Sequence, residues 1–323
     1  MKKPAAAPSL STRRPGRQHK QDESLINNIY LHGIHGAPTG VMRPADKIPL
    51  TEECKHYSSY DEMPEKLQKY WHQRNTLWQY DNYDIRMTDD AWFGVTPEPI
   101  AVEIATEMAA KHARREHKPS VLVDLFAGAG GNTIQFALSG EWDRVIAVER
   151  HAATLACAQH NAEVYEVAEY VTFVHADCFD FLNRLLNRPD TLDDALNVHL
   201  GLGGGDGRGG GGGRGGSAAA TLARGVEVFA SPPWGGVGYQ QADVFDLEAM
   251  EPYSLAHISS SCRPMAHALF LPRNGDLRQL ASLVPDDAAE RLDVVQYCVK
   301  GAAKGLVAYF PPGNEGHVLE RAG

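Results

Sequence analysis

Seven short apolar runs, separated by helical or turn-rich segments, constrain the fold of this 323-residue chain more than any other feature. Each run is too short to cross a membrane but is typical of a strand that is buried on both faces. Helical spacing of apolar residues appears before the first run, in residues 98–116, and between the next runs, in residues 132–139 and 152–164. Strands that alternate with helices favour a doubly wound α/β sheet with right-handed crossovers. The runs span residues 121–126, 144–149, 171–175, 226–230, 267–272, 292–299 and 305–310.

The last two runs are joined by the short segment KGAAKG, at residues 300–305. Such a short connection suits a β-hairpin, because parallel strands need a longer crossover. The sequence therefore predicts a mostly parallel, seven-stranded sheet with a hairpin at one edge, and we place this domain at residues 96–312.

Two segments before the sheet domain have a different composition. Residues 1–54 are expected to form a basic, disordered tail, since residues 1–20 carry six lysines and arginines and no acidic residue. A nuclear-targeting, RNA-contacting or merely solubilising role would suit it. Residues 55–95 are rich in tyrosine and tryptophan but poor in aliphatic residues. They cannot form a core alone, so we expect a small helical lid that folds over the sheet.

A glycine-rich segment interrupts the sheet domain. Residues 201–216 contain 12 glycines in 16 positions, which no packed core can use. We expect this insertion to loop out of the sheet, and two arginines give it a faint RNA-binding character. A second tail is expected at residues 313–323.

Charge and cysteine usage limit the class of function. The formal net charge of -10 argues against a bulk electrostatic grip on a long polyanion. A nucleic-acid partner would therefore be contacted locally, at an end or at a single base. The five cysteines are scattered and never spaced as CxxC, so neither a disulfide framework nor a zinc site is expected, and a reducing intracellular compartment fits. The start MKKPAAAPSL has no apolar core, so we expect no signal peptide and no membrane association.

The segment DLFAGAGGNT, residues 124–133, joins the first run to a helix through a glycine-rich turn. Such a turn lets the backbone approach a ligand at the carboxyl ends of the strands. Its glycines do not match the dinucleotide pattern GxGxxG, so a cofactor without a pyrophosphate fits better. The positions of the turn that we expect to bind this cofactor are Gly128, Gly130, Asn132 and Thr133.

Three acidic residues follow three successive runs and together predict S-adenosylmethionine as the cofactor. Asp124 can accept a hydrogen bond from the amino group of a methionine moiety. Glu149 can bind both hydroxyls of a ribose, as in other adenosine-binding sheets. Asp177 can accept from an adenine amino group. Taken singly, each also has a plain interpretation, as a helix N-terminal acid, a surface acid and a turn former.

The motif Ser231-Pro232-Pro233-Trp234-Gly235-Gly236 follows the fourth run. Two prolines fix the backbone and remove two donors, so carbonyl groups and the Ser231 hydroxyl remain as acceptors for an exocyclic amine. Trp234 offers a face on which a base can stack, worth ~1–3 kcal/mol. The pattern resembles the motif of amino-methyltransferases that act on adenine, cytosine or guanine. A proline-rich loop with a core tryptophan is the plain alternative.

With these motifs in order, the chain resembles the trimethylguanosine synthase family over most of residues 65–310. The resemblance implies a Rossmann-like class I methyltransferase core with a small helical N-terminal extension. It implies that 7-methylguanosine caps of small nuclear and nucleolar RNAs are converted to 2,2,7-trimethylguanosine in two transfers, in the nucleus or nucleolus, with ribonucleoprotein partners that deliver the RNA. The matching stretches are KYWHQR (69–74), WFGVTPE (92–98), DLFAGAGGNTIQFAL (124–138), NAEVY (161–165), SPPWGG (231–236) and LPRN (271–274).

The resemblance also implies roles for single residues. Trp78 and Thr96 would close over the cofactor held by the three acids. Ser231, Pro232 and Trp234 would be the catalytic residues, with the first two addressing the amine and the indole stacking on the methylated base. No metal is implied. The substrate-binding residues would be Lys69 and Arg273 at the cap phosphates, Asn161 beside the base, and Trp234.

This chain departs from the family pattern in places. Glu149 stands where aspartate is usual, which lengthens the reach to the ribose. Gly94 stands where serine is common, so a hydroxyl contact is in doubt there, and Ala127 stands where cysteine is common.

Several positions keep plain alternatives. Thr96 is also a good helix N-cap before Pro97, and we expect both roles. We favour packing for Trp92 and a ligand role for Trp78. Three polar side chains have structural alternatives, as a solvated surface charge, a helix cap and an ion-pair partner respectively: Lys69, Asn161 and Arg273.

Three rival functions remain open from the sequence. An N-methyltransferase for adenine N6 or cytosine N4 would share the Pro-Pro-aromatic motif, and a cap-analogue panel would separate it. A non-catalytic cap-binding module would bind cap without consuming the cofactor. A glutamine-amide methyltransferase could use a similar loop, although the stacking tryptophan favours a base.

Overall fold

The computed structural model describes residues 40–115, 117–202, 218–235, 242–284 and 292–313. Four segments of the sequence lie outside these residues: the tail up to residue 39, the glycine-rich insertion from residue 203, Gly236 of the proline motif, and the tail from residue 314.

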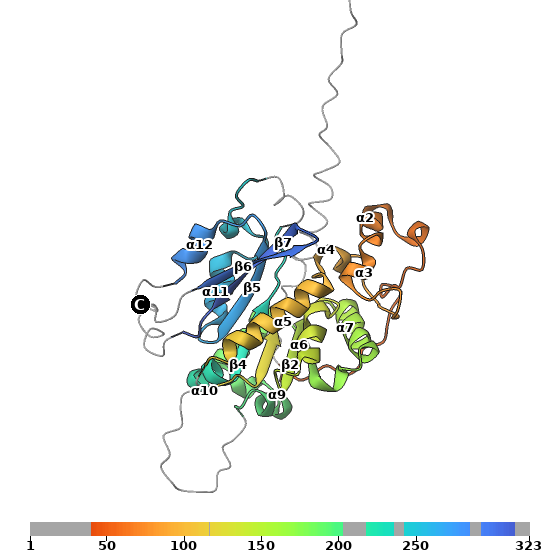
Figure 1. Cartoon of the computed structure of the whole chain (residues 1–323). Helices are drawn as coiled ribbons and strands as arrows, with labels where there is room; N and C mark the ends of the chain where they lie inside the picture. The colour runs from red at the N-terminus through yellow and green to blue at the C-terminus, as the bar shows by residue number, and fades with distance from the viewer. Residues whose placement is uncertain (1–39, 116, 203–217, 236–241, 285–291, 314–323) are drawn as a thin grey trace, which may run out of the picture.

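A seven-stranded sheet forms the centre of the molecule, with the strand order β3-β2-β1-β4-β5-β7-β6 (Figure 1). The first five strands are parallel, and β7 pairs antiparallel with both β5 and β6. The predicted mostly parallel sheet and its edge hairpin are therefore confirmed. The strands span Val121–Asp124 (β1), Arg144–Glu149 (β2), Val171–His175 (β3), Val226–Ala230 (β4), Ala266–Pro272 (β5), Asp293–Val299 (β6) and Ala302–Phe310 (β7).

Burial along the strands follows from this order. Every residue of β1, β4 and β5 is buried, as expected for central strands covered on both faces, whereas β6 at the edge is mostly exposed. The hairpin turns at Lys300 and Gly301, which both have positive φ angles of 51° and 78°. The continuous apolar runs in the sequence thus mark the centre of the sheet.

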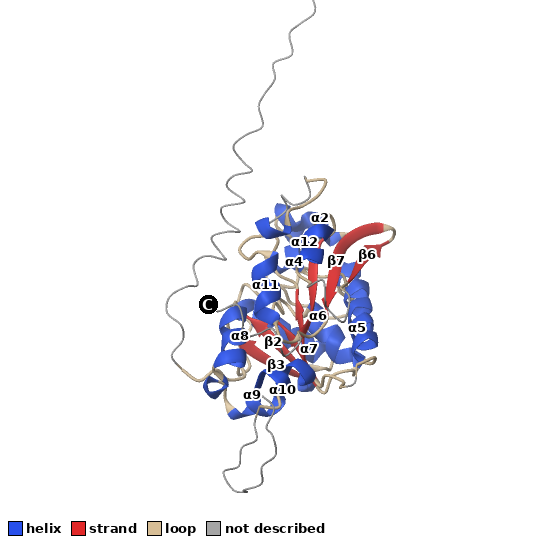
Figure 2. Cartoon of the chain, turned by 90° about the vertical axis from the view of Figure 1, so that its left-hand side faces the viewer, coloured by secondary structure: helices blue, strands red, loops and turns tan. Residues whose placement is uncertain are grey.

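Helices cover both faces of the sheet (Figures 1 and 2). One apolar cluster lies between the sheet and the helices α5 (Glu98–His112), α6 (Gly131–Ser139) and α7 (Ala152–Val164), and it continues into the lid. The other cluster lies beneath the helices of the opposite face. Those helices are α8 (Cys178–Asn187), α9 (Asp194–His199), α10 (Ala218–Gly225), α11 (Leu255–Cys262) and α12 (Leu277–Ser282).

The lid contains the short helices α2 (Gln68–Trp71), α3 (Arg74–Leu77) and α4 (Ala91–Gly94). Helices of four residues are not stable alone. They are held by buried aromatic side chains, since Tyr80 and Trp92 are 2% and 1% exposed and their rings lie 5.4 Å apart. Because these rings belong to the same apolar cluster as α5 and α6, the lid shares its core with the sheet domain.

Residues 40–54 differ from the expected disordered tail. Met42 forms a bridge to Leu192, the Ala45 N–H donates to the Phe173 carbonyl at 2.7 Å, and Lys47 pairs with Glu163 at 2.7 Å. The prediction was wrong for residues 40–54, because the basic composition is limited to residues 1–20 whereas residues 40–54 hydrogen-bond to the edge of the sheet beyond β3. No helix of the described residues is long and apolar enough to cross a bilayer.

Candidate active site

The glycine turn and the proline motif lie at the same edge of the sheet. Asp124, the last residue of β1, is paired in register with Ala147 of β2 and with Phe229 of β4. The chain leaves β1 toward β2 on one side, while β4 lies on the other. This is the topological switch point at which doubly wound sheets bind ligands. The fold thus brings together the residues that the sequence assigned to cofactor and base.

Asp124 is fully buried and hydrogen-bonded. Its carboxylate accepts from the Thr133 hydroxyl at 2.6 Å and from the Phe126 N–H at 3.4 Å. Burial, reinforced by the nearby charge of Glu149, nevertheless raises the pKa of Asp124 to about 7. A cationic ligand group beside this carboxylate would favour its ionised form.

The glycine turn requires glycine at two positions. Gly128 and Gly130 have φ angles of 55° and 95°, which side-chain-bearing residues rarely adopt. A Cβ atom on Gly130 would also lie 3.4 Å from the backbone of Ala158 in α7. The Gly128 N–H donates to Glu149 Oε2 at 3.1 Å, so the turn and the second acid are joined.

Glu149 ends β2 with both carboxylate oxygens engaged. Besides the bond from Gly128, Oε1 accepts from the His151 N–H at 2.8 Å. Burial raises the pKa of Glu149, while these two N–H donors oppose the rise. The glutamate in place of the family's aspartate is therefore held by the backbone on both sides, and its position is fixed before any ligand binds.

Asp177 follows β3 and caps α8. Its Oδ1 accepts from the N–H groups of Phe179 and Asp180 at 2.9 and 3.2 Å, which satisfies two of the free donors of the helix start. Asp177 thus has the local structural role that the alternative interpretation gave it, here as the N-cap of α8. The remaining oxygen, Oδ2, accepts no hydrogen bond from the residues that the structure describes, and the adenine contact that the sequence predicts would use this oxygen.

Thr96 does not act as the predicted helix cap. The N-cap of α5 is Pro97, and no side chain caps this helix. The Thr96 hydroxyl instead accepts from Asn132 Nδ2 at 2.9 Å, because α6 places Asn132 directly beside it. The Asn132 Oδ1 is buried and has no partner among the described residues, so an unsatisfied acceptor lies at the first turn of α6.

Trp78 and Trp92 are each 1% exposed. The Trp78 indole N–H donates to Met87 Sδ at 3.2 Å, and its ring lies beside the glycine turn, 3.8 Å from the position of a Cβ on Gly131. Trp92 packs on Tyr80 within the lid, as the favoured interpretation predicts. Trp78 therefore packs directly behind the backbone of the turn.

Trp234 is half-buried and anchored to the next strand. Its indole N–H donates to the Phe270 carbonyl at 3.2 Å, and the two rings lie 5.6 Å apart at an angle of 47°. Gly235 follows with a φ of 82°. The Phe270 ring is itself supported from β7, where a Cβ on Gly305 would lie only 2.6 Å from it. The indole is thus only partly buried, and its orientation depends on β5 and β7. Ser231 and Pro233 are half-buried beside it, and Pro232 is buried.

Asn161 is fully buried, and both N–H groups of its side-chain amide are used. It accepts from the Arg86 N–H and donates to the carbonyls of Arg86 and Ala129, all within 2.9 Å. To donate to a base, Asn161 would have to give up one of the two bonds to these carbonyls. The helix-cap alternative does not hold either, because the side chain points from α7 to the lid and the glycine turn.

Lys69 and Arg273 are both exposed, and neither forms an ion pair within the described part of the chain. Lys69 lies 5.0 Å from the Tyr70 ring centroid. Arg273 directly follows β5, three residues after the carbonyl that anchors Trp234. The structural ion pair considered for Arg273 is therefore not observed.

Sequence reasoning missed an aromatic group beside the acids. The Phe179 and Tyr253 rings lie 4.6 Å apart, and Phe126 lies 6.2 Å from Tyr253. Phe126 and Phe179 each stand two residues after an acid at a strand end, Asp124 and Asp177, and this shared offset is the signal that could have revealed them. Flat apolar rings at the ends of these strands suit the faces of a planar ligand.

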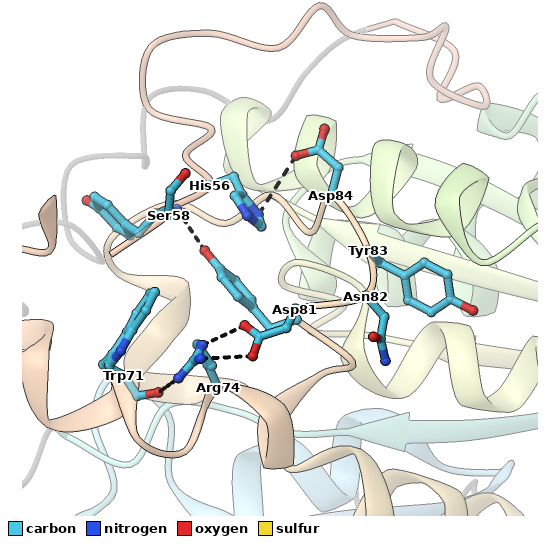
Figure 3. Close-up of a pocket in the computed structure, with 10 residues that line it drawn as sticks. His56, Ser58, Trp71, Arg74, Asp81, Asn82, Tyr83 and Asp84 are labelled. Atoms are coloured by element: carbon cyan, nitrogen blue, oxygen red, sulfur yellow. Dashed lines mark hydrogen bonds and ion pairs between the residues drawn. The ribbon is translucent and has the colours of Figure 1, made fainter. Parts of the chain in front are cut away.

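An open hollow of about 420 Å³ lies on the lid, not at the strand ends (Figure 3). Arg74 is held across it by a two-pronged ion pair with Asp81, at 2.7 and 2.8 Å, and stacks 4.1 Å from the Trp71 ring. The acidic residues that line this hollow, Asp81 and Asp84, form ion pairs with Arg74 and Arg86, and they are not the acids at the strand ends. Within the described residues, no cluster of His, Cys, Asp or Glu could hold a metal.

Comparison with known proteins shows which family and relatives the chain resembles. A profile of the RNA cap guanine-N2 methyltransferase family matches residues 119–313. The trimethylguanosine synthase of Schizosaccharomyces pombe is 30% identical over 251 residues, which cover 77% of this chain and 87% of that protein. The trimethylguanosine synthase of Saccharomyces cerevisiae is 32% identical over 220 residues, covering 67% of this chain and 58% of that protein.

Among solved structures, a putative methyltransferase from Porphyromonas gingivalis aligns with a TM-score of 0.48 and 14% identity, covering 79% of this chain and 55% of that one.

Proposed function

Because the chain belongs to the RNA cap guanine-N2 methyltransferase family and is an S-adenosylmethionine-dependent enzyme, we propose that it acts on the 7-methylguanosine cap of small nuclear and nucleolar RNAs and gives 2,2,7-trimethylguanosine. The observation that carries this proposal is the anchored Trp234 indole, which follows the strand next to the acid-lined glycine turn. We place this activity in the nucleus, with ribonucleoprotein partners that present the RNA.

The acids and the turn fit the cofactor. Asp124, whose raised pKa signals an unfavourable buried charge, would bind the amino group of its methionine moiety. Glu149 would bind the ribose, and Asp177 the adenine amine through its free oxygen. The buried Asn132 Oδ1 supplies a further acceptor without a partner among the described residues. When bound, the cofactor supplies an electrophilic methyl group on a sulfonium.

The remaining cofactor positions shape the site without contributing charge. Gly128 and Gly130 allow the backbone to approach, and Thr133 orients the Asp124 carboxylate. Trp78 packs behind the turn, and Thr96 orients the Asn132 amide.

Trp234 would hold the base. A 7-methylated guanine carries positive charge, so stacking on the indole gains a cation–π contribution of ~0.5–2 kcal/mol that unmethylated guanine lacks. The bond from the indole N–H to Phe270 fixes the angle of this platform. Ser231 and Pro232 would accept from the exocyclic amine and direct its lone pair to the methyl group, so that most of the catalysis comes from positioning.

Lys69 and Arg273 would bind the phosphates of the cap, since both are exposed cations without a carboxylate partner in the described ranges. Asn161 would act indirectly, by joining the lid at Arg86 to the glycine turn at Ala129. This replaces the direct base contact with a positioning role, which the full burial of Asn161 and the use of both its N–H donors favour.

The test is incubation of the full chain with S-adenosylmethionine and a 7-methylated cap dinucleotide, followed by mass spectrometry. We expect products that carry one and then two added methyl groups on the guanine amine. The unmethylated cap dinucleotide and an adenine-containing RNA serve as controls and should remain unmodified. Methylation of adenine or cytosine, or cap binding without transfer, would overturn the proposal.

A further inference from the structure

A partly exposed aromatic ring of the lid lies close to two lysines. Phe93 is 37% exposed. The Nζ atoms of Lys66 and Lys69 each lie 5.8 Å from the centroid of its ring. Single exposed apolar side chains are common and need no explanation. Two ammonium groups over one exposed ring are a different feature, because aromatic faces and cations together bind single-stranded nucleic acid.

The position of this ring is fixed by its neighbours. The preceding residue, Trp92, is buried in the lid, and the Phe93 N–H donates to the Asp90 carbonyl at 3.1 Å. The Tyr70 ring meets Phe93 edge-on, at 5.8 Å and 88°. The ring can therefore receive a ligand without first being ordered, which lowers the entropic cost of binding.

The ring also lies close to the candidate active site along the chain. Val95, two residues after Phe93, lies 3.2 Å from the position of a Cβ on Gly131 in the glycine turn. Two residues span at most ~7 Å. The platform ring is therefore joined by a short stretch of backbone to the turn on the cofactor side of the candidate site.

The charges of the lid favour a polyanion at this position. Arg74 is neutralised by Asp81 and Arg86 by Asp84. Neither Lys66 nor Lys69 forms an ion pair with any carboxylate in the part of the chain that the structure describes. In a chain of net charge -10, two unpaired cations on one aromatic surface are a local site for phosphate.

We propose that Phe93, Tyr70 and Lys66, here called the Phe93 platform, bind the first transcribed nucleotide of the capped RNA, next to Lys69, which the proposed function assigns to the cap phosphates. This proposal rests on the proposed function, since it extends the cap site by one nucleotide. The base stacks on Phe93, and Lys66 binds the phosphate that follows it. Stacking accepts any base, so the platform selects capped RNA over the free cap nucleotide without reading sequence.

The experiment compares two ligands, 7-methylguanosine triphosphate and a capped tetranucleotide, by calorimetry on the full chain. We expect the wild type to bind the capped tetranucleotide about tenfold more tightly, as a stacked base predicts. Phe93→Ala should lose this tenfold gain and bind the free cap nucleotide within about twofold of wild type. Phe93→Trp should retain the gain, since it keeps an aromatic face.

A matched control is Tyr170→Ala, because Tyr170 is 49% exposed but precedes β3, at the opposite end of the strands. It should leave both affinities unchanged. Equal weakening of both ligands by Phe93→Ala would show that the ring only supports the lid, and an undiminished tenfold gain would show that no base stacks there. Either result overturns the platform.

Lys66 provides a second, independent readout. Lys66→Gln should reduce the slope of log affinity against log salt for the capped tetranucleotide by about 0.7, the value of one single-strand phosphate contact. An unchanged slope would remove Lys66 from the proposal. A wild type that binds and methylates the free cap nucleotide but shows no gain from the longer RNA contradicts the platform alone. A wild type that neither binds nor methylates either ligand contradicts the proposed function as well.

Discussion

Asn161 holds both backbone groups of Arg86. The Arg86 N–H donates to Asn161 Oδ1, and Asn161 Nδ2 donates to the Arg86 carbonyl, each at 2.8 Å. The second hydrogen of the amide goes to Ala129 in the glycine turn, at 2.9 Å. One buried side chain thus joins the lid, α7 and the cofactor-side turn.

Asn161→Ala should therefore destabilise the fold and release the lid at Arg86. Leaving several buried backbone groups unsatisfied costs about 2–4 kcal/mol in the free energy of unfolding. Denaturant unfolding measures this cost, and trypsin should cleave after Arg86 faster than in the wild type. Asn197→Ala is the matched control, because Asn197 bridges the carbonyls of Pro189 and Leu192 far from the lid. Equal rates of cleavage after Arg86 in both variants would contradict the role of Asn161 in holding Arg86.

Trp234→Ala should abolish turnover while leaving the cofactor bound. Loss of stacking and of the cation–π contribution, about 2–4 kcal/mol together, predicts a fall in kcat/KM of about 100-fold or more. Calorimetry with S-adenosylhomocysteine should give a Kd within about threefold of wild type. Trp234→Phe keeps a ring but loses the bond to Phe270, so its activity should lie between that of the wild type and that of Trp234→Ala. A large loss of cofactor affinity in Trp234→Ala would contradict the assigned role.

Asp124 should make the ligand-free protein less stable as pH rises. Its pKa is raised from 3.8 to about 7 by burial. Between these two values the folded chain keeps a proton that the unfolded chain has released, so the free energy of unfolding falls with pH. Asp124→Asn removes this titration. The variant should gain on the order of 2–4 kcal/mol over the wild type between pH 4 and pH 8.

Denaturant unfolding of both ligand-free proteins across this range measures the difference. The same variant should bind S-adenosylmethionine much more weakly, because the neutral amide cannot balance the ligand's amino charge. If the difference in the free energy of unfolding between the two proteins does not depend on pH, the pKa of Asp124 is not raised in the folded chain.

Asp177 should show two separable roles. Asp177→Ala loses the cap of α8, which costs ~1 kcal/mol, and also weakens cofactor binding. Asp177→Ser should restore the stability, since serine caps well, but not the affinity, since its hydroxyl is shorter and uncharged. Asp193→Ala is the control: Asp193 caps α9 through Leu196, so stability alone should fall. Cofactor binding at the wild-type level by Asp177→Ser would leave Asp177 with a structural role only.

The sheet and one edge of the site could be predicted because both depend on local patterns. A central strand needs a continuous apolar run, and the residues at its end are then placed by the topology. Asp124 therefore pairs with Phe229 of β4, the strand that leads into the proline motif, although 105 positions separate the two residues in the sequence. The glycine turn is equally local, since positive φ angles require glycine.

Long-range hydrogen bonds explain what the sequence did not reveal. Thr96 has the local signature of a helix cap, yet Asn132 competes for its hydroxyl from another helix. Asn161 carries no local sign that it binds Arg86, 75 positions away. Residues 40–54 have no apolar periodicity, and they are ordered by bonds to β3 and to the loop near Leu192. Hydrogen bonds between residues so far apart in the sequence do not produce a periodic pattern of residue types.

Gly305 has no contact with any proposed ligand, yet the space for the Phe270 ring exists only because this position lacks a side chain. Exchanging one hydrogen for a methyl group on β7 would displace the Phe270 ring, and with it the support beneath the Trp234 indole. Inherited or engineered changes that silence such an enzyme need not fall in its recognisable motifs. Gly305→Ala, although a small change, should therefore reduce activity in the same way as a substitution of Trp234.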